Sequence, residues 1–519
     1  MPTIKKLVLH NFKRFASFEV NFDSKINIFI GDNEAGKSSI LTALDIVMSG
    51  STSKVESMGL SSLFNTETVT KFFAGVKTVS ALPKMFVEIY LTDQGNFELN
   101  GKYNSKEVSC DGLRLECEVN PDFSKEVALL LAEDGENFPF EYYSIKFSTF
   151  SGENFTGYRR FIKHIVVDSS QINSDHATRE YTKSVYGTHA TTLDRHKHEN
   201  EYRKHKNNFR NVALNEMNMK LADYKFSVRS SPKASLESDL IITEDDIPIE
   251  SKGKGKQCII KTEFALQKGK QALDVVLLEE PENHLSHVNM RKLIDHIADA
   301  DNNQLFIATH SNLICTRLDL RKAIILNLGV SDPVILKALP SDTAKFFIKA
   351  PDNNILEFAL SRKVILVEGD AEFILLESLY GKYSSSTLAK DGVHVISVGG
   401  TSFKRYLDLA KLLKVRTAVV RDNDGDYANN CVTNYSMYAE PHINVFSDTD
   451  NTRETFERCF YQDNVAVCDE LFLPGRVSLN VQDYMLKNKA DCAFELLDKK
   501  GGELAAPEYI KKAIAWIRE

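Results

Sequence analysis

The sequence lacks several features that define whole classes of protein. Its eight cysteines include no CxxC pair and no zinc-ligand spacing, so we expect reduced thiols of a cytoplasmic protein. Charges interrupt the start at Lys5 and Lys6, so no signal peptide is expected. No apolar run approaches the length that spans a bilayer, and no membrane partner is therefore expected.

A basic excess is also missing. The net charge of −8 argues against a protein that binds nucleic acid through its overall charge. It is compatible with a local basic groove, because partners respond to the distribution of charge. With 519 residues the chain is too long for a single core, so roughly two to four domains are expected.

A complete phosphate-binding pattern follows the strand expected at residues 26–30. Residues 31–38 read GDNEAGKS, which matches GxxxxGK[ST] in full, and a helix is expected directly after them. Backbone N–H groups of such a loop wrap the phosphates of a nucleotide at a helix N-terminus. We expect Lys37 to meet the β and γ phosphates of ATP and Ser38 to bind Mg²⁺. The other cofactor-binding candidates are Gly31, Asn33, Gly36 and Ser39.

Two later patterns complete a nucleotide site. The apolar run at 275–278 ends in Glu279 and Glu280, which is the Walker B arrangement. Glu279 is expected to bind Mg²⁺ through water, and Glu280 to polarise the attacking water as a catalytic residue. The run at 305–308 ends in Thr309-His310-Ser311, and His310 is expected to sense the γ-phosphate.

Acidic residues follow two further apolar runs near the end of the chain. Residues 364–367 precede Glu368 and Glu372, and residues 417–420 precede Asp422 and Asp424. Both runs read as buried parallel strands, whose C-terminal ends meet at the edge where α/β sheets bind ligands. So many carboxylates cannot all ionise side by side without a cation, and their hard oxygens suit Mg²⁺ or Mn²⁺. The alternative is a solvated acidic edge.

The first group of motifs resembles a known kind of ATPase. GDNEAGKSS, LLEEPENHL and IATHS, in this order, resemble an ABC-type ATPase of the structural-maintenance and OLD (overcoming lysogenization defect) group. Such ATPases sandwich ATP between two heads, which implies a homodimer or higher homo-oligomer. The candidate signature segment, residues 251–257, departs from the group because it contains several lysines. Glu279 also replaces the commoner aspartate.

The acidic segment resembles a Toprim module. The matching residues are Glu368 in VEGDAE, Gly399-Gly400, and Asp422 with Asp424 in DND. An ABC ATPase followed by Toprim is the arrangement of OLD family endonucleases. That resemblance implies two more site residues: Glu457 in a TLE-like element, as a metal ligand, and Lys500, as a catalytic lysine.

The resemblance implies a two-metal cleavage of phosphodiester bonds in DNA. In such a mechanism two metals about 4 Å apart clamp the scissile phosphate. We expect Glu368, Glu372 and Asp422 to bind the metal that activates water, and Asp424 and Glu457 to bind the other. Lys500 would neutralise charge in the transition state. Asp370 and Asp426, which lie nearby in the sequence, are further candidate metal ligands.

The expected fold is α/β. An ABC-type ATPase head is assigned to residues 1–170 and 236–340, with an inserted helical segment at 171–235, and a Toprim domain with a C-terminal extension to 357–519. Residues from about 336 to 356 read as a linker. The inserted segment mixes histidines with lysines and arginines, which predicts either a helical arm that dimerises or touches DNA phosphates, or a solvated helical hairpin.

The leading hypothesis is therefore an ATP-regulated, metal-dependent DNA endonuclease. Family members often serve antiphage defence, alone or with a helicase, or with a retron reverse transcriptase and its noncoding RNA/DNA. Two alternatives remain. One is a regulatory ATP-binding protein whose Toprim domain is inert. The other is a Toprim topoisomerase or primase-like enzyme, and a topoisomerase would need a tyrosine nucleophile.

Overall fold

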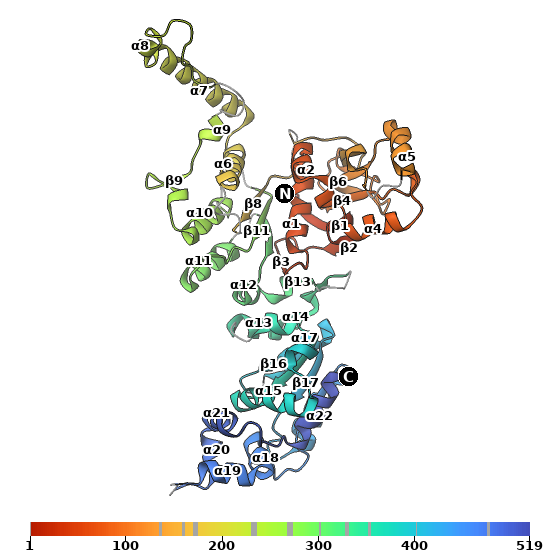
Figure 1. The fold of residues 1–519 in the computed structure, drawn as a ribbon, viewed down its shortest axis with the longest axis vertical. Coiled ribbons are helices and arrows are strands. Elements are labelled where there is room, and N and C mark those ends of the chain that lie inside the picture. Colours follow the sequence, from red (N-terminus) through yellow and green to blue (C-terminus); the bar gives the residue numbers. More distant parts are fainter. Residues whose placement is uncertain are drawn as a thin grey trace. The chain divides into compact units, whose positions relative to one another are not determined.

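Figure 1 shows the computed structural model. It describes residues 2–133, 137–157, 161–169, 175–229, 236–266, 273–299, 303–326, 332–350, 354–400, 402–474 and 478–519. The chain forms two compact units, Met1–His310 with Leu326–Pro333, and Ser311–Ile325 with Val334–Glu519. Within the described ranges, no helix combines the length and hydropathy that crossing a bilayer requires.

The first unit begins with an antiparallel sheet. The order of its main path is β2-β1-β4-β6-β5, and β7 pairs with β6. Its strands are β1 (Ile4–Phe12), β2 (Phe15–Asn21), β4 (Met85–Leu91), β5 (Asn100–Gly101), β6 (Cys110–Val119) and β7 (Tyr143–Thr149). Alternating apolar and polar residues predicted strands at the positions of β1, β2, β4 and β6, and the structure confirms these strands, although β4 is buried along almost its whole length.

Four parallel strands of the first unit carry the nucleotide motifs. They lie in the order β3 (Ile26–Gly31), β12 (Gln304–Ala308), β11 (Val275–Glu279) and β8 (His164–Asp168). Helix α1 (Lys37–Ser49) contacts all four strands and also β4 and β6. Parallel strands buried on both faces read as continuous apolar runs, which is how β11 and β12 were recognised. Because the strands are parallel, their motifs meet at one edge of the sheet.

The remaining helices of the first unit flank these sheets. They are α2 (Thr52–Met58), α3 (Leu60–Leu63), α4 (Thr66–Ala74), α5 (Ser124–Ala132), α10 (Lys254–Leu266) and α11 (His287–Ala298), with the short helices η1 (Val79–Ala81), η2 (Pro121–Phe123), η3 (Phe140–Tyr142) and η5 (Ile249–Ser251).

The basic middle segment is helical, as its composition predicted. It contains α6 (Asp175–His189), α7 (Thr192–Val212), α8 (Asn215–Asn218) and α9 (Leu236–Asp239), followed by the hairpin of β9 (Thr243–Glu244) and β10 (Ile247–Pro248). A capping box between Thr191 and Asp194 starts α7. None of the residues of α7 is buried, so it is a surface helix.

The second unit begins with small elements that the sequence did not predict. They are α12 (Asn312–Arg317), η6 (Leu320–Lys322), β13 (Ala323–Leu326), β14 (Val334–Ile335), η7 (Leu336–Ala338), α13 (Ser341–Lys349) and α14 (Ile355–Leu360). The prediction of a linker at residues 336–356 was wrong for the described residues of this range, because Leu336, Phe347 and Ile355 are fully buried. Its Pro340-Ser341-Asp342 run is the start of helix α13.

A four-stranded parallel sheet forms the centre of the second unit. Its order is β16 (Val393–Ser397), β15 (Lys363–Val367), β17 (Arg416–Val420) and β18 (Ile443–Phe446). The helices of this part are α15 (Asp370–Ser384), α16 (Leu388–Asp391), α17 (Phe403–Leu413), η8 (Ala428–Val432), η9 (Thr433–Tyr438), α18 (Phe456–Asp463), α19 (Val465–Phe472), α20 (Val481–Lys487), α21 (Lys489–Lys500) and α22 (Glu508–Arg518). Its core joins strand residues such as Ile365 and Val420 to Leu375 of α15 and Ile514 of α22.

Helices α15 and α21 run side by side in the same direction. Gly369 and Ala371, at the start of α15, line one cavity with Lys489 and Ala490, at the start of α21. Near their other ends, Nζ of Lys382 donates hydrogen bonds to the carbonyl groups of Gly502 and Leu504. This parallel packing brings two helix N-termini to the edge of the sheet where β15 and β17 end.

Candidate functional site

The phosphate-binding loop of the first unit joins β3 to α1. Gly36 has φ of 100°, which favours glycine, and a Cβ placed there would lie 2.4 Å from Cζ of Phe15. Nζ of Lys37 donates to the carbonyl groups of Gly31 at 2.7 Å and of Asp32 at 3.0 Å. The side chain of Lys37 therefore lies over the loop that would bind the phosphates.

The acids after β11 face this loop. Burial raises the pKa of Glu279, and a hydrogen bond with Ser38 opposes that effect. Oε2 of Glu280 accepts from Nδ2 of Asn283 at 2.7 Å, and its Oε1 lies 3.9 Å from Nε2 of His310. Glu280, with φ of 44°, is in the left-handed region, which turns the backbone at the strand end. The structure thus brings together Ser38, Glu279, Glu280 and His310.

Two contributors to the nucleotide site were missed from the sequence. Oε1 of Glu282 accepts from Oγ1 of Thr309 and from the N–H of His310, both at 2.7 Å, and so positions the THS segment. Asp168 ends β8 in register with Glu279 of β11. Glu282, the third acid of EEPE, could have been predicted from the sequence, because it lies in the same motif as Glu279 and Glu280. Asp168 could not, because only the pairing of β8 with β11 places it next to Glu279.

The candidate signature segment lies at the start of α10. A Cβ on Gly255 would lie 2.5 Å from the carbonyl oxygen of His284, so the close approach of these backbones requires glycine. Nε2 of Gln257 donates to the carbonyl groups of Glu250 and Lys252. The segment is therefore an ordered helix start, and its role toward a second head stays a prediction.

In the second unit, strand pairing brings two acidic segments to one edge. Val367 of β15 pairs with Val420 of β17, so Glu368 and Asp422 follow neighbouring strand ends. The N–H of Asp422 lies 3.4 Å from Oε2 of Glu368. A cavity of about 170 Å³ at this edge, the acid pocket, is lined by Glu368, Gly369, Asp370, Ala371, Glu372, Asp422, Lys489 and Ala490.

The carboxylates of the acid pocket raise the pKa of one another. Burial raises the pKa of Asp422 to about 8, and the charges of Glu372, Glu368 and Glu457 act in the same direction. Burial raises the pKa of Glu372 to about 7, again with help from Glu457 and Glu368. Burial also raises the pKa of Glu368. These four acids therefore share one electrostatic site, which a cation would stabilise.

Two predicted site residues are bound to side chains outside the acid pocket, although the charge of Asp424 adds to the effect of burial that raises the pKa of Glu368. Oδ2 of Asp424 accepts from Arg421 at 2.7 Å, and this aspartate is not among the residues that line the acid pocket. Nζ of Lys500 lies 2.9 Å from Glu470 and 3.4 Å from Glu503, both on the surface. Asp426, one of the further candidate metal ligands, accepts from Asn429.

Lys489 is the pocket lysine that the sequence analysis missed. Its Nζ lies 3.1 Å from Oε2 of Glu457, whose side chain is nearly fully buried. Nothing in the local sequence distinguishes Lys489 from other surface lysines, because only the packing of α21 on α15 brings it to the acids.

The double-glycine turn at Gly399-Gly400 was singled out from the sequence. In the structure the N–H of Gly400 donates to the carbonyl of Glu368 at 2.9 Å.

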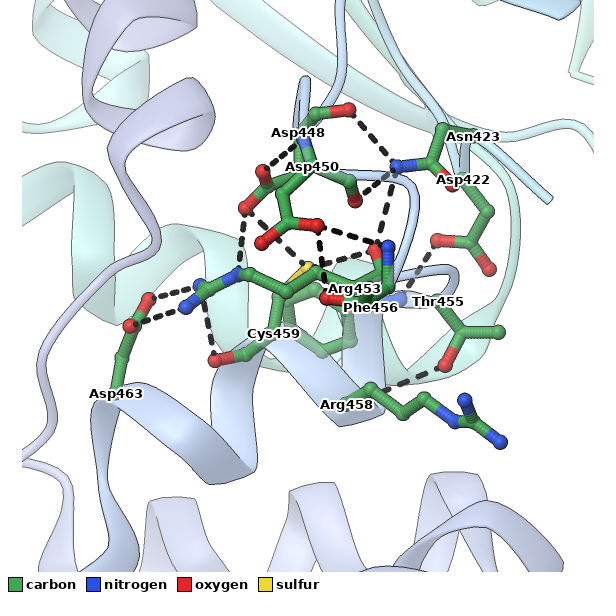
Figure 2. A network of polar contacts seen from close by, with 11 residues as sticks. Asp422, Asn423, Asp448, Asp450, Arg453, Thr455, Phe456, Arg458, Cys459 and Asp463 are labelled. Carbon is green, nitrogen blue, oxygen red and sulfur yellow. Dashed lines mark hydrogen bonds and ion pairs between the residues drawn. The ribbon is translucent and has the colours of Figure 1, made fainter. Parts of the chain in front are cut away.

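Figure 2 shows the hydrogen bonds that position the loop after β17. Nδ2 of Asn423 donates to the carbonyl groups of Asp448, Asp450 and Arg453 at 2.9, 3.0 and 3.4 Å. Oδ1 of Asp422 accepts from the N–H of Phe456 at 2.7 Å, at the start of α18. This contact places Asp422 beside the helix that carries Glu457, which explains why the charge of Glu457 raises the pKa of Asp422.

Replacing Asn423 by alanine is expected to loosen this loop. The amide is 1% exposed, so the change leaves buried carbonyl groups without their donor. A loss of about 2–3 kcal/mol in the free energy of unfolding should follow, measured by denaturant titration. Asn429→Ala is the matched control, because Asn429 is exposed in η8 and its side chain donates to the nearby Asp426. Equal stability of the two variants would contradict the role given to Asn423.

The acid pocket suits a divalent cation in its chemistry. Carboxylate oxygens are the ligands that Mg²⁺ and Mn²⁺ prefer. The buried Oε2 of Glu457 lies 3.1 Å from the ammonium of Lys489, so this anionic oxygen already faces a cation. No three histidine, cysteine, aspartate or glutamate side chains of the described ranges already stand together as a metal-binding group.

Comparisons with known proteins identify both parts of the chain. Residues 3–315, more than half of the chain, match the family described as "AAA ATPase domain". Residues 360–424 match "Overcoming lysogenization defect protein-like, TOPRIM domain", the segment from β15 to Asp424. These two matches confirm the expected α/β fold class, an ATPase head followed by a Toprim domain.

Individual relatives cover smaller parts. The chromosome partition protein Smc of Halothermothrix orenii is 33% identical over 113 residues, which is 21% of this chain and 9% of that protein. The chain therefore spans about a tenth of the length of that relative.

Two solved structures are also similar. The C-terminal region of the Burkholderia pseudomallei OLD protein is 23% identical, with a TM-score of 0.25, over 31% of this chain and 98% of that one. The Smc head domain with an extended coiled coil, bound to the C-terminal domain of ScpA derived from Pyrococcus furiosus, is 16% identical, with a TM-score of 0.37, over 67% and 99%.

The motifs, their positions at the strand ends and the two family matches agree with one another. The chain belongs to the AAA ATPase domain family, and its residues 360–424 form an OLD-like TOPRIM domain.

Proposed function

We propose that the protein is an ATP-regulated DNA endonuclease that requires Mg²⁺ or Mn²⁺. The observation that supports this most is the acid pocket, in which Glu368 and Asp422, after the ends of two parallel strands, converge with Glu372 from the first turn of α15. Acids at this edge of a sheet are where an α/β protein places its chemistry. Several buried carboxylates whose pKa values are raised by burial, and further by one another's charge, are typical of functional sites.

The residues of the acid pocket would each have a definite part. Glu368, Glu372 and Asp422 would hold one divalent cation, and Glu457 would hold a second, with Asp424 after release from Arg421. When bound, the cations would activate water and polarise the phosphate. Asn423 and Gly400 position Asp422 and Glu368 through the hydrogen bonds described above. Lys500 would act only after leaving Glu470 and Glu503.

The nucleotide site would regulate the nuclease. Lys37 and the N–H groups of the loop from Gly31 to Ser39 would bind the phosphates of ATP. Ser38 and Glu279 would hold Mg²⁺, and Glu280 with His310 would position the attacking water and sense the γ-phosphate. The proximity of Glu280 and His310 supports this division of roles.

A topoisomerase is the weaker reading. Its nucleophile would be a tyrosine that faces the bound phosphate, and no tyrosine is among the described residues that line the acid pocket. Covalent protein–DNA adducts after denaturation would favour it, whereas free 5′ and 3′ ends favour hydrolysis.

The oligomeric state, the location and the biological role of the protein are part of the same proposal. We expect the heads to pair as homodimers or higher homo-oligomers around ATP, and the protein to act in the cytoplasm. An antiphage defence role, with a helicase, or with a retron reverse transcriptase and its noncoding RNA/DNA, fits the OLD family. The exposed basic helix α7 is available for DNA phosphates or for dimerisation.

A plasmid assay tests the proposed activity. Supercoiled DNA should be nicked or linearised with Mg²⁺ or Mn²⁺, and remain intact with a chelator. Glu368→Gln should reduce the rate by on the order of 100-fold, because it removes one anionic ligand while keeping the side-chain shape. The exposed acid Glu377, one helical turn beyond the pocket on α15, gives the control variant Glu377→Gln. Cleavage that persists at full rate in chelator, or in Glu368→Gln, would reject the assignment.

A further inference from the structure

Lys489 occupies an unusual place for an exposed lysine. It is the first residue of α21, and its side chain is 51% exposed. The carboxylate it meets, Glu457, has a side chain that is only 4% exposed. A long flexible side chain thus reaches from solvent to a buried anion, with its Nζ 3.1 Å from Oε2.

The same ammonium faces the other acids of the pocket. Lys489 lines the cavity together with Glu368, Glu372 and Asp422. Its charge lowers the pKa of each of these three acids, although burial outweighs that effect. Arg421, the nearby guanidinium, is already bound to Asp424. Lys489 is therefore the cation that lines the pocket itself, while the charge of Arg421 acts on Glu368 from outside the pocket lining.

We propose that Lys489 takes the place of a divalent cation at Glu457 in the metal-free protein, and that the lysine and the metal compete for this carboxylate. The proposal rests on the proposed function, because it takes the acid pocket as the metal site. It rests on two observations together: Nζ of Lys489 lies 3.1 Å from Oε2 of Glu457, and Lys489 lines the acid pocket together with Glu368, Glu372 and Asp422.

The chemistry makes the competition direct. A divalent cation bound at the same oxygen would lie about 2 Å from it, too close to an ammonium at ion-pair distance for both to remain. Lysine carries a point charge on a four-carbon stem with many rotamers, so it can leave toward solvent without disturbing α21. Lys489 would therefore neutralise the buried Glu457 until a metal binds, and would then move away into solvent.

Binding of Mn²⁺, measured by electron paramagnetic resonance on the full chain without nucleotide, tests the competition. Lys489→Met keeps the apolar stem but removes the charge, so the affinity for Mn²⁺ should rise about tenfold. Lys489→Arg retains a competing cation, and its affinity should stay within about threefold of the wild-type value. Lys499→Met is the matched control. Lys499 lies on the same helix, is equally exposed at 51%, and is ion-paired to Glu495 away from the pocket.

Thermal unfolding supplies a second measurement. In chelator, Lys489→Met should melt below the wild type, and saturating Mn²⁺ should remove most of the difference. Unchanged or weaker Mn²⁺ binding in a folded Lys489→Met variant, with binding still lost in Asp422→Asn, would overturn the competition alone. Equal Mn²⁺ binding by wild type and Asp422→Asn would instead reject the acid pocket as the metal site, and with it the proposed function.

Discussion

Asp422→Asn should lose at least about a thousandfold in the rate of DNA cleavage, while ATP hydrolysis continues within about twofold of the wild-type rate. Asp422 is 7% exposed and lies at the junction of Glu368, Glu372 and Glu457. Asparagine can still accept the hydrogen bond from Phe456, so the loop should keep its conformation. Only the charge that would bind the metal is removed.

Plasmid cleavage with Mg²⁺ and phosphate release from ATP are the two measurements. The DNA-stimulated and basal rates of ATP hydrolysis should be recorded separately, since cleavage products could alter the former. Loss of both activities in a folded variant would mean that the pocket controls ATP turnover, and cleavage at the wild-type rate would remove Asp422 from the site.

The same substitution should stabilise the metal-free protein at alkaline pH. The pKa of Asp422 rises from 3.8 to about 8 on folding, mainly through burial, so the folded state binds a proton that the unfolded state has released. Between these two pH values the stability of the wild type must fall as pH rises, and above about 8 the loss is complete. Asp422→Asn has no such proton, so its stability should change less with pH.

The size of this difference follows from the linkage of protonation to folding. One pKa unit corresponds to about 1.4 kcal/mol, and the coupling of Asp422 to Glu372 leaves an expected difference on the order of 3 kcal/mol at pH 8. Melting curves at pH 5 and pH 8 in chelator measure it. The two proteins should differ little at pH 5 and clearly at pH 8, and Mg²⁺ should reduce the gap by stabilising the wild type. Parallel pH profiles would contradict the buried-charge argument.

Lys37→Ala should weaken ATP binding by about two orders of magnitude and leave the fold intact. The lysine is 6% exposed, and its Nζ bonds only backbone carbonyl groups of its own loop among the contacts of the described residues. The negative charges of Glu280, Asp32, Glu282 and Glu279 favour its protonated form, although burial lowers its pKa. A phosphate would therefore exchange backbone dipoles for a full opposite charge, which the alanine variant cannot offer.

Equilibrium binding of a fluorescent ATP analogue, with melting curves for both proteins, checks this expectation. Lys71→Ala is the control, because Lys71 forms an exposed ion pair with Glu67 on α4, and such pairs contribute little. Unchanged affinity in Lys37→Ala would remove the phosphate-binding role of the loop, and a large loss of stability would show that Lys37 is structural.

Local sequence patterns predicted those site residues that lie at or just after the end of a strand. Glu368, Glu279 and Asp422 follow apolar runs of four or five residues, and parallel strands align their ends without further information. The glycine pattern at 31–38 was equally readable, because backbone geometry requires it. The proposed linker failed because Pro340-Ser341-Asp342 can begin a helix as well as a loop, and only the burial of Phe347 decides between them.

The sequence by itself determined the two chemistries of this protein, a phosphate-binding ATPase motif set and an acidic strand edge, because each is written in contiguous residues of fixed spacing. The tertiary structure alone decided which charges meet. It brought Lys489 to the acid pocket and to Glu457 through the packing of α21 and α18, and paired Asp424 with Arg421 and Lys500 with surface glutamates. Charge acts through space over a few ångströms, and no spacing along the chain records that distance.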